Sequence, residues 1–184
     1  MITTSPRLIL KTRHTKCRSN VNWDQDTRVL SLLLTYLDED RNIENLKLSE
    51  KIAQDFGIEQ GDYRLILGEM DILLDFKKRI TSLEIRTNPL TWQPCSLLPI
   101  PCEPDAVFVN FVVDYDENCI ASYDLPIRIM QDLSRHELSF GFGDFATSRW
   151  AVIADNLAVG MTADNHLNEF RLSDFIDGGN GSTR

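Results

Sequence analysis

The sequence predicts an α+β protein, with three N-terminal helices followed by a small antiparallel β domain that contains one helix. Two observations support this prediction. Apolar residues recur every three or four positions between residues 27 and 76, which is typical of helices that bury one face. After residue 105, apolar residues instead come in short runs separated by Asn, Asp and Gly, which is typical of strands joined by tight turns.

Three stretches of the N-terminal half have the helical period. In TRVLSLLLTYL, five apolar residues would face a core, and Asp24 or Asp26 could cap the helix by accepting hydrogen bonds from backbone N–H groups. In LKLSEKIAQDFG, Ser49 is the expected N-cap, and Gly57 stands where a left-handed C-cap residue is needed. The third stretch is YRLILGEMDILLDF. We therefore expect a compact three-helix unit within residues 23–88.

Residues 106–176 predict the β domain. AVFVNFVVD, residues 106–114, reads as a strong strand, and residues 148–175 contain three apolar runs separated by two ADN turns, which predicts a meander. LPIRIMQDL, residues 125–133, predicts the one helix. Residues 89–105 are rich in proline and predict a connector or an arm along a sheet edge, because proline lacks a donor and fixes φ. A basic arm (1–22), which starts with a short strand (RLILK), and a flexible tail (177–184) complete the expected organisation.

The charge of the chain is unevenly distributed. The net charge is −9, yet residues 1–30 hold six Arg or Lys against two Asp. A basic arm ahead of an acidic body suits contact with a polyanion or an acidic partner, although a solvated terminus is the alternative.

No apolar stretch is long enough to span a bilayer and no signal peptide is evident, so we expect a cytoplasmic protein without a membrane partner. The four cysteines lack CxxC spacing, so neither a metal nor another cofactor is expected.

The stretch SEKIAQDFGIEQGDYRLILG resembles the helix-turn-helix of the winged-helix superfamily. Small Ala53 lies at the helix-crossing position, Gly57 lies at the turn, and Ile58 anchors it. The resemblance covers about residues 27–88, with KKRITSLEIR as a possible β wing. It implies a non-enzymatic DNA-associated protein, or a protein-docking module inside a larger assembly.

Residue roles follow from the resemblance and from the charge pattern. Gln60 and Arg64 would contact base edges, although Gly68 and several carboxylates in the same stretch depart from the usual recognition helix. The expected phosphate contacts are Lys47, Lys51, Lys77, Lys78 and Arg79. The expected contacts of the basic arm are Arg7, Lys11, Arg13, Lys16 and Arg18.

Two other functions stay open. A protein-interaction or scaffolding subunit could dock a partner through the helical unit or the β meander, with Trp92 as the expected contact. A metal-dependent phosphoryl-transfer enzyme could use the carboxylates of DYDEN, residues 114–118, although the same letters make a good hairpin turn. Residues 132–136 offer Asp, Ser and His without a nucleophile elbow. FGFGDFA, with Gly141 and Gly143, lacks the strand and helix that a dinucleotide loop requires and predicts a turn.

Overall fold

The computed structural model describes residues 5–12, 16–37, 63–75, 77–100, 107–143 and 146–175. The strands are β1 (Arg7–Thr12), β2 (Lys16–Asp24), β3 (Val29–Leu37), β4 (Tyr63–Leu67), β5 (Met70–Leu74), β6 (Ile80–Arg86), β7 (Gln93–Pro94), β8 (Val107–Val112), β9 (Ile120–Tyr123), β10 (Arg128–Asp132), β11 (Glu137–Gly141), β12 (Arg149–Ala154), β13 (Leu157–Met161) and β14 (Leu167–Leu172). One 3-10 turn, η2 (Pro89–Thr91), is the single helical element of the described residues. The predicted α+β class is therefore wrong, because this part of the chain is all β. None of its helices could cross a membrane.

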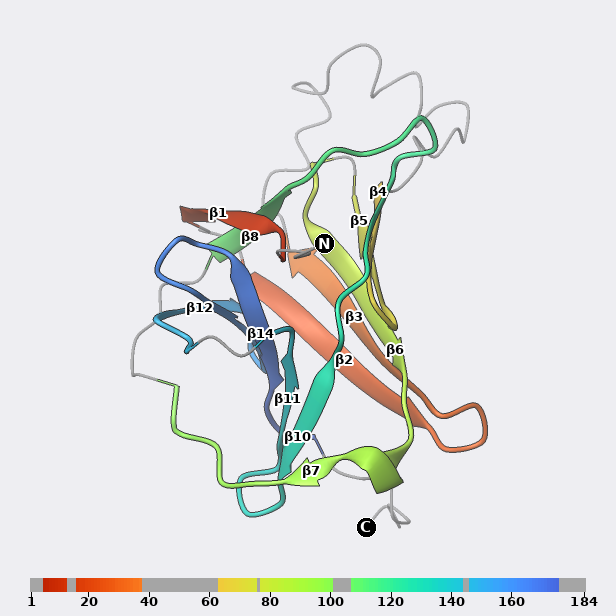
Figure 1. Ribbon diagram of the computed structural model, residues 1–184, viewed down its shortest axis with the longest axis vertical. Coiled ribbons are helices and arrows are strands. Elements are labelled where there is room, and N and C mark those ends of the chain that lie inside the picture. The colour runs from red at the N-terminus through yellow and green to blue at the C-terminus, as the bar shows by residue number, and fades with distance from the viewer. Residues whose placement is uncertain are drawn as a thin grey trace.

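The strands form two six-stranded sheets and one two-stranded sheet (Figure 1). Sheet I has the order β2-β3-β6-β5-β4-β9, and sheet II has the order β12-β13-β14-β11-β10-β7. Neighbouring strands are antiparallel, except for the parallel pairs β4–β9 and β7–β10. Strand β1 pairs with β8 across one end of the molecule (Figure 1).

The inward faces of both sheets contribute to a single hydrophobic cluster. In β5 the buried residues alternate with half-buried ones, as expected for a strand with one face in a core. Strand β9 lies after the proline-rich segment in sequence but pairs with β4 in sheet I. Strands from both sides of the expected domain boundary therefore share one sheet and one core.

The first predicted helix is the strand β3. Leu30, Leu32 and Leu34 are buried, whereas Leu33 is 56% exposed, which is the period of a strand. The sequence misleads because consecutive leucines satisfy the helical and the strand periods equally well. The capping prediction has a different outcome: Asp24 accepts hydrogen bonds from two backbone N–H groups, but it does so in the loop of the β2–β3 hairpin.

The third predicted helix is the hairpin β4–β5. Gly68 at its turn has a φ of +57°, and a Cβ at this position would overlap the backbone oxygen of Leu125. The predicted recognition helix is therefore absent, and the hypothesis of a DNA-binding helix-turn-helix is wrong. The second predicted helix lies outside the described residues. The helix predicted over residues 125–133 is replaced by β10 and the segment before it.

The strands predicted in the β domain are confirmed. Residues 106–114 contain β8, and residues 148–175 contain the meander β12–β13–β14, with turns at the two ADN sequences. Residues of the expected basic arm lie in β1 and β2. Every residue of β13 and β14 is buried, so the outward face of sheet II is also covered.

Candidate functional site on the outward face of sheet II

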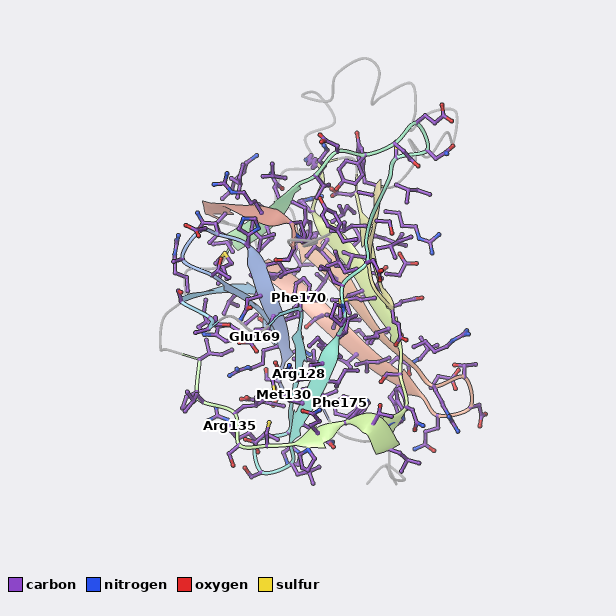
Figure 2. The ribbon with its side chains drawn as sticks, in the orientation of Figure 1. Arg128, Met130, Arg135, Glu169, Phe170 and Phe175 are labelled. Carbon is purple, nitrogen blue, oxygen red and sulfur yellow. The ribbon has the colours of Figure 1, made fainter. Side chains whose placement is uncertain are left out.

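Charged residues line the outward face of sheet II. Phe140 and Phe170 lie opposite each other and point into the core, so the alternation of the strands turns Ser139, Glu169 and Arg171 outward. Figure 2 shows Glu169 on the side of sheet II that faces away from sheet I. As whole residues these three are nevertheless at most 8% exposed, which is unusual for charged residues such as Glu169 and Arg171.

The centre of this face is a charge cluster made of Glu137, Glu169 and Arg171. The guanidinium of Arg171 lies between the two carboxylates, with Nη1 at 4.0 Å from Oε2 of Glu137 and Nη2 at 3.5 Å from Oε2 of Glu169. The side chain of Arg171 is only 6% exposed. A buried charge is costly unless it is paired, so each member of the cluster depends on the others.

Neighbouring side chains complete the cluster. Ser139 Oγ donates to Glu169 Oε2 at 2.6 Å, and Thr147 Oγ1 donates to the other oxygen of Glu169 at 2.8 Å. The ring of Trp150 lies 4.4 Å from the guanidinium carbon of Arg171, a cation–π contact. Thr147 also lies directly over Gly160, where a Cβ would collide with it. The segment before β12 therefore covers one side of the face.

A strap, residues 93–100, covers the other side. It begins as β7 beside β10, and the N–H of Cys95 then donates to the carbonyl of Gln131 at 3.0 Å. The N–H of Leu97 donates to Oδ2 of Asp132 at 2.8 Å, and Arg171 donates to the carbonyl of Leu98. The strap therefore lies along the edge of sheet II, held by backbone hydrogen bonds to β10 and by two hydrogen bonds to the side chains of Asp132 and Arg171.

Asp132 joins the strap to the β10–β11 turn. Its Oδ1 accepts from the hydroxyl of Ser134 at 2.6 Å and from the N–H groups of Ser134 and Arg135. The Ser134 hydroxyl and the Leu97 N–H hold the pKa of Asp132 below its usual value, because they stabilise the ionised carboxylate. A charged Asp132 can therefore fix both segments at neutral pH.

The titratable side chains of the site are constrained by burial and by one another. Burial raises the pKa of the Cys95 thiol, and the negative charge of Asp132 raises it further, so this cysteine is protonated and a poor nucleophile. Both carboxylates of the charge cluster share one guanidinium. Glu137 Oε2 and Arg171 Nε lack hydrogen-bond partners among the described residues, but both atoms are fully enclosed. The charge cluster therefore makes no contact with solvent at these atoms, and it influences the surface by holding the strap in place.

The strap and the adjacent turn expose a surface that we call the strap surface, made of Leu98, Leu133 and Arg135. Leu98 is 81% exposed and Leu133 is 66% exposed. Arg135 binds Glu137 at 3.0 Å but keeps 38% of its side chain exposed. Residues 93–100 and 133–136 contain no Asp or Glu, so this surface is apolar and basic on a chain of net charge −9.

No family model matches this chain, and no curated protein matches it.

The residues predicted to contact DNA are spread over the molecule. Arg7 and Lys11 lie on β1, and Lys16 and Arg18 lie on β2. Arg64 lies on β4, where its Nε donates to both carboxylate oxygens of Asp71 at 2.9 Å. Gln60, Lys47, Lys51 and Arg13 lie outside the described residues.

The predicted phosphate contacts after β5 have partners within the chain. The ammonium of Lys78 lies 4.8 Å from the ring centroids of both Tyr63 and Tyr115. Arg79 pairs with Asp75 at 2.6 Å and stacks on an aromatic ring, whereas Lys77 is exposed. These contacts fix the β5–β6 connection.

Trp92 lies in the core. It is 6% exposed, its ring packs edge-on against Trp23 and Phe175, both at 5.7 Å, and its Nε1 donates to Thr87. A contact between Trp92 and a partner stays a prediction.

The weaker motifs lie in turns and at strand ends. Asp116 accepts from the N–H groups of Asn118 and Ile120, as a hairpin turn requires. Ser134 donates to Asp132 instead of to a histidine. Gly141 ends β11, and no group of metal-ligating side chains occurs within the described ranges.

The sequence reasoning missed Glu137, Glu169 and Arg171. In LNEFRL, the two charged residues alternate with apolar ones, which is the pattern of a strand with one wet face. The many apolar residues of β13 and β14 could have indicated strands that are buried on both faces. Nothing in the sequence, however, identifies the strap as the segment that covers the charged residues.

Proposed function

We propose that the protein is a non-enzymatic protein-interaction subunit that uses the strap surface to bind an acidic, apolar segment of a partner protein. The observation that supports this proposal is the high exposure of Leu98 and Leu133 on backbone that is already fixed. Large exposed leucines at one place on a monomer are typical of interaction sites.

The rigidity of the strap favours tight binding. The Leu97 N–H and the Leu98 carbonyl are both held by buried charged side chains. A surface that is ordered before binding loses less conformational entropy when the partner arrives. Each leucine can then contribute most of the roughly 25 cal/mol per Å² that apolar burial provides.

The charge of the surface selects the partner. Arg135 is exposed, whereas the nearby Asp132 and Glu137 are buried. An acidic partner segment would be attracted here and repelled by most of the remaining surface of this acidic chain. An anionic membrane would meet the same repulsion over a much larger area, so a protein segment is the better fit. The free thiols of Cys95 and Cys119 fit the reducing cytoplasm expected from the sequence.

A peptide-display selection tests this proposal. The purified protein is immobilised and used to select from a random 12-residue peptide library, with parallel selections on Leu98→Asp and Leu133→Asp. We expect the wild-type chain to enrich peptides that combine Asp or Glu with Leu, Ile or Phe. Fluorescence anisotropy of an enriched peptide should show weaker binding to both variants, and binding should weaken with added salt.

Leu90→Asp is the matched control. Leu90 is 91% exposed but lies in η2, away from the charge cluster, so its replacement should leave peptide binding unchanged. Enrichment that survives both strap variants, or the absence of any enrichment, would refute the proposal. Binding to phosphatidylserine vesicles in place of peptides would show that the surface recognises a membrane.

A further inference from the structure

The outward face of sheet I is a second surface, on the opposite side of the molecule from the strap. Strand registers give one row across it, Asn20–Leu33–Ser82–Leu73–Arg64–Ile120. Leu33, near the centre of β3, is 56% exposed, and Leu37 on the same strand is 38% exposed. Ile66, Leu73 and Ile120 are half-buried on the same face. Apolar side chains therefore occur on this face from β3 to β9, interrupted by Ser82 on β6 and Arg64 on β4.

The charges on this face nearly cancel, because the strand registers place three acidic and four basic residues on it, Lys16 at the end of β2 included. The other six are Arg18, Arg64, Arg86, Asp24, Asp71 and Glu84. The whole chain carries −9, so two copies repel each other at most of their surfaces. A face with so little net charge is where two copies can meet with the least repulsion.

A second copy could also relieve an unfavourable contact. Asp71 and Glu84 lie directly opposite each other on β5 and β6, and like charges in this arrangement destabilise a sheet. Arg64 donates to Asp71, and the charge of Glu84 raises the pKa of Arg64 less than Asp71 does. In a two-fold interface, Arg18 or Arg86 of the other copy can approach Glu84.

The size of the face suits a dimer. Its strands are four to nine residues long, and strands lie about 4.8 Å apart with about 3.3 Å per residue, so the face has a projected area of roughly 600 Å². The accessible area of a pleated face is larger than its projection. A standard interface buries about 800 Å² per partner.

We infer that the outward face of sheet I binds a second copy of this chain, which makes the protein a two-fold dimer with a strap surface on each outer side. This inference concerns a different surface from the proposed function, so each can fail alone.

Sedimentation velocity of the full chain tests the inference at about 1 to 200 µM, a range that resolves dimers of micromolar affinity. We expect the wild-type chain to shift from 21.1 kDa toward twice that mass as concentration rises. Leu33→Asp should raise the dimer dissociation constant at least tenfold. Val112→Asp, at a 51% exposed position on β8, and Leu98→Asp should leave it unchanged.

Circular dichroism and thermal unfolding at low concentration establish that the variants are folded. If Leu33→Asp does not fold, Arg18→Glu together with Arg86→Glu tests the same face by charge and should also weaken the dimer. A wild-type chain that stays monomeric up to the highest concentration would overturn the inference. So would a dimer that tolerates the changes at Leu33, Arg18 and Arg86.

Discussion

The charge cluster of sheet II leads to a quantitative prediction for Arg171→Met. Methionine keeps most of the apolar volume but removes the charge, which leaves Glu137 and Glu169 buried with side chains only 9% and 11% exposed. Breaking a buried ion pair on one side costs about 3–5 kcal/mol. The lost hydrogen bond to the carbonyl of Leu98 adds about 1 kcal/mol. We therefore expect the free energy of unfolding to fall by about 4–6 kcal/mol.

Urea denaturation at pH 7 measures this loss. With an m-value of about 2.5 kcal/mol per M, the midpoint should fall by about 2 M. Amide exchange at Cys95 and Leu97 should accelerate at the same time, because the strap loses one of its attachments. The matched control is Arg135→Met, which removes a guanidinium from the same carboxylate, Glu137, at a position that is 38% exposed. Solvent screens that pair, so its loss should cost less than about 1 kcal/mol.

A double-mutant cycle separates charge pairing from packing. If pairing dominates, Arg171→Met combined with Glu169→Gln should cost clearly less than the sum of the two single changes. The reasoning fails if Arg171→Met costs less than about 1 kcal/mol, or if the two changes are strictly additive.

Three further predictions test other features. Gly68→Ala should lower the free energy of unfolding in urea by about 2–4 kcal/mol, because Gly68 has a positive φ and a Cβ there would overlap the backbone oxygen of Leu125. Gly141→Ala is the control: a Cβ there would make only an ordinary van der Waals contact, so the free energy of unfolding should change by less than about 1 kcal/mol. Burial raises the pKa of Tyr115 to about 12, so this hydroxyl ionises in the unfolded chain at a lower pH than in the folded chain. The free energy of unfolding should therefore fall between about pH 10 and 12. Tyr115→Phe should reduce that fall when urea unfolding is measured across this pH range. Hydrogen bonds from a neighbouring hydroxyl and from backbone N–H groups hold the pKa of Asp132 below its usual value. The protection factor of the Leu97 amide, which is the exchange rate of an unstructured chain at the same pH divided by its own, should therefore stay high at neutral pH and fall as the pH falls through that lowered pKa. Asp132→Asn should remove this pH dependence.

The sequence predicted the C-terminal strands because their turns are explicit. In residues 148–175, the two ADN sequences divide the apolar residues into runs that are too short for helices and match the length of strands. The prediction failed for β3 and for the hairpin β4–β5 because apolar residues follow one another in these strands. Leu73 is half-buried and Leu74 is fully buried, yet the letters are identical, so hydrophobicity alone cannot give their orientation. Gly68 was interpreted as a weak point in a helix, although a glycine between two short apolar runs equally indicates a hairpin.

The candidate site was beyond sequence reasoning for a different reason. Glu137 and Arg171 are far apart along the chain and meet because β11 and β14 are neighbours in sheet II. The proline-rich segment was expected to lie along an edge or to act as a connector, and its composition suits either. The segment lies on sheet II because the carboxylate of Asp132 accepts a hydrogen bond from the N–H of Leu97. The same carboxylate is oriented by the N–H of Ser134 in the turn after β10.

The parallel pair β4–β9 has a consequence for synthesis of the protein. Strands β2 to β6 leave the ribosome first, but the edge of β4 is closed only when residues 120–123 follow. Until then, four backbone positions of β4 present an open edge to other chains, and such edges promote aggregation. A chain that ended within the proline-rich segment would lack residues 120–123 and would leave this edge open.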